Sequence, residues 1–342
     1  MRFFLALVFA LGLIAAGAAE WAGAAWNEPG PLAPTGNQTV VLIAPRTSVH
    51  DIAQQLQDSR LLNYALVFEF DLRLHGLSSQ VKAGEYAVPS KASMADLAAI
   101  LVSGKSIQHR LTVAEGLTSG MIHKLVANEP VLTGDAGAEP AEGTLLPETY
   151  LFTRGTTRAE LLGRMRKAQE TFLAEHWPGR TEGLPFKTMD EAVTLASIVE
   201  KETSLPEERR HIAAVFVNRL KAGMKLQSDP TIIYGISKGY PLGRGIRESE
   251  IQAATPYNTY VIDGLPPGPI SNPGKDSLSA VLNPEDSRDL YFVATGRGGH
   301  AFAASIAEHQ KNVIAYRIQE KLKDRGEMAS PPPAKPDRHR HA

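Results

Sequence analysis

The pattern of hydrophobic and polar positions divides the 342-residue chain into an apolar start, two folded regions and a polar end. Residues 3–19, FFLALVFALGLIAAGAA, form an uninterrupted run of apolar and small residues that approaches the length of a membrane span. Residues 26–37 are punctuated by proline and glycine, which predicts a linker without a core of its own. Residues 326–342 predict a disordered tail, and its His-Arg-His sequence is assigned no function.

Strand and helix patterns alternate between residues 38 and 108. The run VVLIA at 40–44 predicts a buried strand, and the following apolar periodicity predicts helices over 48–56 and 64–74. A second strand pattern, EYAV, precedes a helix with a serine at its start and a glycine at its end, over 94–104. We therefore expect a small α+β module.

The region 109–325 is dominated by helical periodicity in its first half and by strand-like runs in its second. After Gly223, short strands are expected around TIIYGI (231–236), YVIDG (260–264) and LYFVATG (290–296), between loops rich in proline and glycine. The fold class predicted for the whole chain is α+β, with a small module followed by a larger mixed domain. Helices are expected over 117–127, 158–177, 188–202, 206–222 and 306–322.

The apolar start allows two interpretations. The small residues 16–19 before Glu20 are typical of a signal-peptide cleavage site, whereas Trp21 and Trp26 lie where interfacial aromatics flank a membrane anchor. Because the positive charge of Arg2 stays inside, both interpretations place the rest of the chain outside the cytoplasm.

Composition excludes several classes of function. The chain has 36 Lys and Arg against 37 Asp and Glu, so charge gives no argument for nucleic acid. It has no cysteine, which removes disulfides, cysteine nucleophiles and thiolate metal sites. No His-x-x-x-His pair or paired-acid cluster occurs over 38–322, so neither a metal nor another cofactor is expected.

The stretch LASIVEKETS, at 195–204, contains the strongest candidate for catalysis. A capping box at 188–191 begins a helix, and Glu202 falls on its apolar face whereas Glu200 lies to the side. Burial and the negative end of the helix dipole would raise the pKa of Glu202, as a general acid requires. The alternative is that the helix simply ends in solvent, with Glu200 and Lys201 on a solvated rim.

Stiff polar loops follow this helix, and their amides, hydroxyls and aromatics have the composition of a sugar site. Each loop alone indicates only turns. Glu148 ranks second to Glu202 among the acids, because a loop glutamate is more often a surface charge, and His300 is best explained as a turn residue. The candidate substrate-binding residues are Gln227, Asp229, Tyr257, Asn258, Thr259 and Glu148.

Several motifs occur together in a specific order. ASIVEKET, VFVNRL, LQSDPTIIYG, TPYNTY, GLPPGPISNPG and LYFVATGRGGHAF resemble those of the endolytic murein transglycosylases, the MltG or YceG-like family, over residues 38 to 322. The resemblance implies a LysM-like module at 38–108, a catalytic transglycosylase domain at 109–325 and an inner-membrane anchor at 1–25. It also implies that the catalytic residue is the second glutamate of the EKET block, Glu202.

The activity implied by this resemblance is peptidoglycan cleavage without water. One glutamic acid protonates the oxygen between N-acetylmuramic acid and N-acetylglucosamine, then takes the proton of the muramyl C6 hydroxyl, which closes a 1,6-anhydro ring. The implied partners are glycan strands, the inner membrane, and cell-wall synthases or division and elongation proteins. The alternatives are a non-catalytic peptidoglycan-binding protein, and a hydrolase using Glu202 with Glu148 or Asp229.

Overall fold

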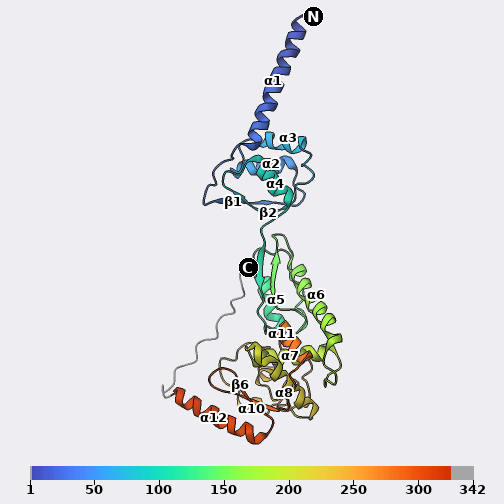
Figure 1. Ribbon diagram of the computed structural model, residues 1–342, viewed down its shortest axis with the longest axis vertical. Helices are drawn as coiled ribbons and strands as arrows, with labels where there is room; N and C mark the ends of the chain where they lie inside the picture. Colours follow the sequence, from blue (N-terminus) through green and yellow to red (C-terminus); the bar gives the residue numbers. More distant parts are fainter. Residues whose placement is uncertain (1, 325–342) are drawn as a thin grey trace. The chain divides into compact units, whose positions relative to one another are not determined.

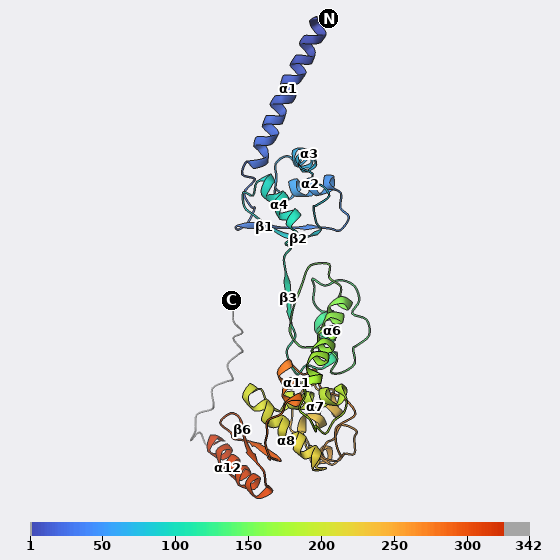
Figure 2. The ribbon, with the colours of Figure 1, turned by 45° about the vertical axis from the view of Figure 1, so that its right-hand side comes forward.

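The computed structural model describes residues 2–324, which form two compact units (Figures 1 and 2). The first unit comprises the chain up to Arg110 together with Leu151–Thr156, and the second comprises Leu111–Tyr150 and the chain from Thr157 onward. Two strands at this division, β3 (His109–Thr112) and β4 (Thr149–Phe152), pair with each other. The predicted boundary after residue 108 therefore lies close to the observed division, but a later segment returns to the first unit. The predicted tail, 326–342, lies outside the described residues.

The first unit is built on one antiparallel strand pair with helices on one side of it (Figure 1). Ser48 caps the helix that follows the first strand, and Ser93 forms a capping box with Asp96, so the local signals in the sequence place both helices correctly. Phe68 and Tyr86 are fully buried in its core. Its elements are β1 (Gln38–Ile43), α2 (Val49–Asp58), α3 (Ala65–Leu74), β2 (Gly84–Pro89) and α4 (Met94–Ser103).

The apolar start of the chain folds as the helix α1 (Arg2–Asn27), which belongs to the first unit. Its end packs into that unit's core, because Ala25 is buried and Trp26 stacks on Phe68 with ring centroids 6.0 Å apart. Among the described residues, no helix meets the length and apolarity that crossing a membrane requires, so the predicted transmembrane helix over 3–19 is not confirmed. The LysM-like interpretation of the module likewise stays a prediction.

The second unit is a helical core with a small sheet. The helices α7 (Met189–Glu202), α8 (Arg209–Lys221) and α11 (Lys275–Leu282) contact one another. They bury the side chains of Ile198, Val199 and Phe216 among them. The pair β5–β6 aligns Phe292 with Phe302, and the last helix packs beside it (Figure 2). The helices are α5 (Ser119–Ala127), α6 (Arg158–His176), α7 (Met189–Glu202), α8 (Arg209–Lys221), α9 (Asp229–Ser237), α10 (Glu248–Ile251), α11 (Lys275–Leu282) and α12 (Ile306–Asp324), with the strands β5 (Tyr291–Ala294) and β6 (His300–Ala303) and the 3-10 turns η1 (Trp177–Gly179) and η2 (Pro206–Glu208).

Two of the expected strands are wrong. TIIYGI lies in the helix α9, where Pro230 occupies the first turn and needs no backbone donor. Its isoleucines favour a strand when the segment is considered in isolation, because their side chains are β-branched. YVIDG forms a turn instead, since the amides of Val261 and Ile262 both donate to the carbonyl oxygen of Asn258. The strand expected at LYFVATG is confirmed as β5.

Candidate active site

Glu202 is the last residue of α7, the helix that the sequence predicts over 188–202, and a capping box begins this helix. Thr188 accepts from the amide of Glu191, and the Glu191 carboxylate accepts from the amide of Thr188 in return. The helix ends because Thr203 adopts an extended conformation (φ −142°, ψ 140°), and η2 begins three residues later. Glu202 therefore lies at the corner between two helical segments, at the boundary predicted between the helices over 188–202 and 206–222.

Glu202 lines a small cavity of about 150 Å³ in the second unit. The hydroxyl of Ser228 donates a hydrogen bond to Oε1 of Glu202 over 2.5 Å. Asp229, at the start of α9, is the other carboxylate that lines this cavity. The lining residues are Glu202, Arg219, Leu226, Gln227, Asp229, Tyr260 and Phe292.

The surroundings of Glu202 favour its protonated form. Burial among protein atoms raises its pKa to about 7, and the neighbouring charge of Asp229 acts in the same direction, whereas the hydrogen bond from Ser228 lowers it. The side chain keeps partial access to solvent, because it lines the cavity. At neutral pH a substantial share of Glu202 therefore carries the proton that a general acid needs.

Backbone geometry presents Gln227 and Asp229 to the cavity. Gln227 has a positive φ of 53°, an uncommon conformation for a residue other than glycine, and its amide donates to the carbonyl oxygen of Thr259. The amide of Ser228 donates to the hydroxyl of Thr259 over 2.9 Å. Asp229 accepts a hydrogen bond from the Tyr260 hydroxyl over 2.7 Å. The loops at 227–230 and 257–260 thus brace each other.

The structure separates the predicted substrate-binding residues into two groups. Gln227 and Asp229 line the cavity of Glu202, whereas Asn258 and Thr259 are fully buried. Asn258 donates to three backbone carbonyl oxygens of residues 250–253, so it shapes its own loop. Neither Asn258 nor Thr259 lines the cavity of Glu202, so their contact with a substrate stays a prediction.

Tyr257 and Glu148 do not line the cavity of Glu202. Tyr257 packs against Tyr234 with ring centroids 4.9 Å apart. Glu148 forms an ion pair with Lys275 over 2.7 Å, and both side chains are about half exposed at 47%. It lines a different surface hollow, so the structure gives it no contact with the catalytic candidate.

Sequence reasoning missed three residues that surround Glu202, namely Ser228, Tyr260 and Arg219. All three lie inside motifs already singled out, LQSDPTIIYG, TPYNTY and VFVNRL respectively, so these motifs were the available signal. Arg219 is buried, and its Nη1 donates to the carbonyl oxygen of Leu226 over 2.9 Å while its Nε donates to that of Leu290. It ties the loop before the cavity to the segment entering β5.

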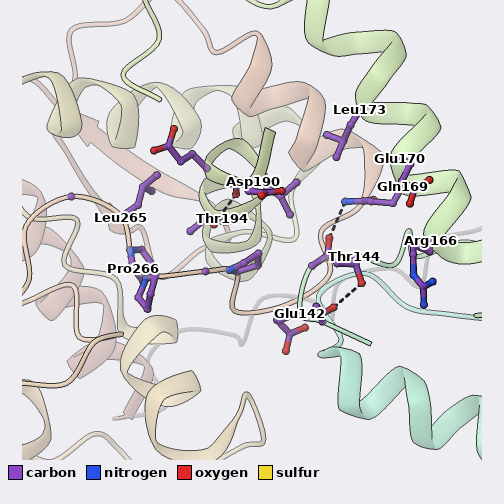
Figure 3. A pocket seen from close by; sticks show the side chains of 18 of the residues that line it. Glu142, Thr144, Arg166, Gln169, Glu170, Leu173, Asp190, Thr194, Leu265 and Pro266 are labelled. Atoms are coloured by element: carbon purple, nitrogen blue, oxygen red, sulfur yellow. Dashed lines mark hydrogen bonds between the residues drawn. The ribbon is translucent and has the colours of Figure 1, made fainter. Parts of the chain in front are cut away.

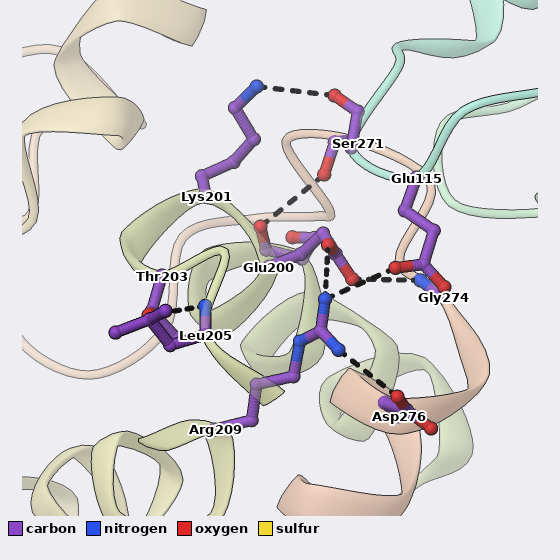
Figure 4. Close-up of polar contacts among 11 residues, drawn as sticks. Glu115, Glu200, Lys201, Thr203, Leu205, Arg209, Ser271, Gly274 and Asp276 are labelled. Atoms are coloured by element: carbon purple, nitrogen blue, oxygen red, sulfur yellow. Dashed lines mark hydrogen bonds and ion pairs between the residues drawn. The ribbon is translucent and has the colours of Figure 1, made fainter. Parts of the chain in front are cut away.

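Glu200 does not lie on the solvated rim that the alternative interpretation of this helix end gave it. Its side chain is only 6% exposed and lies 3.5 Å from the guanidinium of Arg209, whose own side chain is 9% exposed (Figure 4). The amide of Gly274 also donates to Glu200 over 3.0 Å. Arg209 further contacts Glu115 and Asp276. Glu200 thus joins the end of α7 to α8 and to the loop before α11, and it is not a free surface charge.

A second polar contact lies beside Thr203. His300, which was expected in a turn, is the first residue of β6, and its Nδ1 lies 2.7 Å from Oε2 of Glu208. The other oxygen of Glu208 accepts from the backbone amide of His300, and Thr203 donates to Glu208 over 3.3 Å. These bonds hold the β5–β6 pair against the chain that follows Glu202.

The raised pKa of Glu202 predicts a pH dependence. A general acid acts in its protonated form, so with Glu202 in that role kcat/KM should fall about tenfold per pH unit above about pH 7. The hydrogen bond from Ser228 favours the ionised form, so Ser228→Ala should move this alkaline limb to higher pH. Initial cleavage rates from about pH 5 to pH 9 test this. Ser204→Ala, at an exposed serine, is the matched control, and an unmoved limb in Ser228→Ala would contradict the assignment.

Comparison with known proteins places this site in a family. The sequence profile described as the YceG-like family matches residues 41–315, which include every element around Glu202. The chain belongs to the YceG-like family. Among solved structures, a putative yceG-like protein from Listeria monocytogenes is 28% identical, with a TM-score of 0.52 over 81% of this chain and 99% of that one.

Two relatives of this YceG-like chain carry the name endolytic murein transglycosylase. The protein from Streptococcus pneumoniae serotype 2 is 30% identical over 324 residues, which cover 81% of this chain and 58% of the pneumococcal protein. The protein from Bacillus subtilis is 28% identical over 306 residues, covering 79% of this chain and 82% of the relative. The chain thus spans little more than half the length of its pneumococcal relative.

Proposed function

We propose that this protein is an endolytic lytic transglycosylase, a carbon–oxygen lyase that cuts nascent peptidoglycan strands and terminates their elongation. The observation that carries this proposal is the environment of Glu202, a carboxyl whose pKa is raised to about 7 in a cavity of the second unit. The names of the pneumococcal and Bacillus relatives support the same substrate.

In the proposed reaction, Glu202 acts first as an acid and then as a base. It donates its proton to the oxygen between N-acetylmuramic acid and N-acetylglucosamine, and the carboxylate then accepts the proton of the muramyl C6 hydroxyl. That hydroxyl attacks C1, so the bond to the leaving sugar breaks and a 1,6-anhydro ring forms without water. Ser228, which donates to Oε1 of Glu202, holds the carboxyl in place between these steps.

Gln227 and Asp229 are the proposed substrate contacts. Both line the cavity, and the carboxylate of Asp229 and the amide of Gln227 supply acceptors and donors for sugar hydroxyl and acetamido groups. The positive φ of Gln227 supports this role, because strained backbone is concentrated at functional sites. Tyr257 does not line this cavity, and we propose it only as a contact for sugars farther along the strand from Glu202.

Asp229 also supports a second candidate function, a muramidase that uses water. Two-carboxylate glycosidases place a second acid near the first, and Asp229 shares the cavity of Glu202. The hydrogen bond from Tyr260 occupies one oxygen of Asp229, which favours a positioning role over activation of water. Glu148, paired with Lys275 at another hollow, is the weaker partner for a hydrolase.

Product analysis decides between these functions. We expect purified glycan strands to yield fragments with anhydromuramyl ends, each one water lighter than a reducing end, when mass spectrometry is used. Reducing muramyl ends would instead assign a hydrolase with Asp229 as the second carboxylate. A preparation that binds strands but leaves them uncut would indicate a non-catalytic peptidoglycan-binding protein.

We further propose that the protein acts at the inner membrane with its catalytic region in the periplasm. The support is the apolar run 3–19, together with exposed apolar side chains on the first unit. Leu66, Phe70 and Leu74 repeat at four-residue spacing along α3 and are 70%, 57% and 68% exposed, which forms a stripe suited to a lipid surface.

Fractionation of cells tests this location. We expect the intact chain in the membrane pellet after an alkaline wash, with an N-terminus at the start of the sequence. An N-terminus at or near Glu20 would show that the apolar run is a cleaved signal. Recovery of uncleaved protein in the wash supernatant would contradict stable attachment.

A further inference from the structure

A second cavity of about 860 Å³ lies in the second unit, beside the first half of α7 (Figure 3). None of its lining residues lines the cavity of Glu202. Its volume falls within the range of sites that hold small molecules or short peptide segments. Its walls come from α6, α7, the loop 141–144 and the loop 264–269.

The apolar wall of this cavity is tightly built. The loop LPPGP at 265–269 supplies three prolines, and Leu173 and Val193 add aliphatic surface. Gly143 has a φ of 75°, and a Cβ atom there would meet Pro269 at 2.6 Å and Val193 at 2.9 Å. Only glycine lets the loop 141–144 approach Pro269 and Val193 this closely.

Charged groups at the cavity are mainly acidic. Four carboxyl groups and one guanidinium line it, belonging to Glu142, Glu170, Asp190, Glu191 and Arg166. Asp190 and Glu191 are exposed in the first turn of α7. The amides of residues 187 and 188 lower the pKa of Glu191, so this carboxylate is ionised at neutral pH. Burial raises the pKa of Glu142, so the negative charge of the cavity comes mainly from the exposed acids Glu170, Asp190 and Glu191. This charge favours a ligand that carries a positive group.

A buried amide supplies a second recognition element. Gln169 is 3% exposed, and its Nε2 donates to the carbonyl oxygen of Gly143 over 3.2 Å (Figure 3). Its Oε1 has no hydrogen-bond partner in the described part of the chain. Buried acceptors rarely lack a donor in folded proteins. A ligand N–H group that enters beside Gly143 would donate a hydrogen bond to Oε1 of Gln169.

We infer that this cavity binds a short peptide with a free amine. The amine faces Asp190, and a backbone N–H of the peptide donates to Oε1 of Gln169 while the peptide packs against the prolines of the loop at 265–269. On the proposed function, peptidoglycan itself provides such a ligand, the peptide stem that muramic acid carries. Asp190 and Glu202 are 12 residues apart on one helix, about 18 Å at 1.5 Å per residue. The peptide therefore contributes to strand binding rather than to bond cleavage, and this predicts an effect on KM without an effect on kcat.

Calorimetric titration with a soluble stem peptide tests the inference directly. The full chain should bind the peptide with a free side-chain amine about fivefold more tightly than the N-acetylated peptide, the scale of an exposed ion pair. Asp190→Asn should remove this difference, and Asp286→Asn, at another exposed acid, should preserve it. Equal affinity for the two peptides in the wild-type chain would overturn the inference.

Kinetics on two substrates provide the second measurement. Asp190→Asn should raise KM several-fold on strands that carry peptides, with kcat unchanged, and should leave both constants unchanged on strands stripped of peptides. An equal change on both substrates would overturn the peptide assignment. Failure of the wild-type chain to cut either strand would refute the proposed function alone, because the titration does not depend on cleavage.

Discussion

Replacing Glu202 by glutamine should lower the rate of glycan cleavage by about 100-fold or more, the usual share of general acid–base catalysis. Glutamine keeps the size of the side chain and an oxygen that can accept from Ser228, but it cannot donate and recover a proton. Stability should change little, since the substitution removes no packing atoms and relieves a carboxyl of burial. Release of soluble fragments from purified strands, with thermal unfolding in parallel, gives both quantities.

The matched control for this prediction is Glu207→Gln in η2. Glu207 is exposed, five residues after Glu202, and its loss should leave the rate near the wild-type value. Retention of a rate within about threefold of wild type by Glu202→Gln would remove Glu202 from the chemistry. The general acid would then have to be sought at Asp229, the other carboxylate that lines the cavity.

Replacing Arg209 by methionine should destabilise the second unit by about 3 kcal/mol, toward the lower end of what breaking a buried ion pair costs. The change leaves the buried carboxylate of Glu200 with the amide of Gly274 as its remaining hydrogen-bond donor in the described part of the chain. The contacts of Arg209 with Glu115 and Asp276 add little, because those acids are 40% and 68% exposed. Urea unfolding followed by fluorescence measures the loss.

Two further variants make this prediction specific. Arg288→Met, at an exposed arginine, should leave stability near the wild-type value. The double variant Arg209→Met with Glu200→Leu should recover part of the loss, because an apolar pair can replace a buried ion pair. If the double variant were less stable than Arg209→Met alone, the burial of an unpaired Glu200 would not be the cause. Activity should fall with Arg209→Met as well, since Glu200 and Glu202 share the last turn of α7.

The sequence by itself determined most helices and the placement of Glu202. Ser48, Ser93 and Thr188 each cap a helix through contacts within three residues, so the information is local and legible in one chain. The position of Glu202 on the buried face of α7 also follows from a 100° rotation per residue. The family motifs added the identity of the reaction, which helical periodicity alone does not specify.

Only the tertiary structure decided what surrounds Glu202. Ser228 reaches it from 26 positions away, and Glu200 meets Gly274 from 74 positions away. No periodicity encodes such pairs, because they depend on how separate helices pack. For the same reason the sequence left a solvated rim open for Glu200, whereas packing against α8 and α11 buries it.

The segment TIIYGI shows the same division between local and tertiary information. Its β-branched residues favour a strand in isolation, but in the folded chain Pro230 begins α9 and the buried Ile232 and Tyr234 pack on the helical core. Burial of these side chains outweighs a preference worth less than about 1 kcal/mol per residue. The sequence thus singled out Glu202 as the candidate acid, and packing determined its proton affinity and its neighbours.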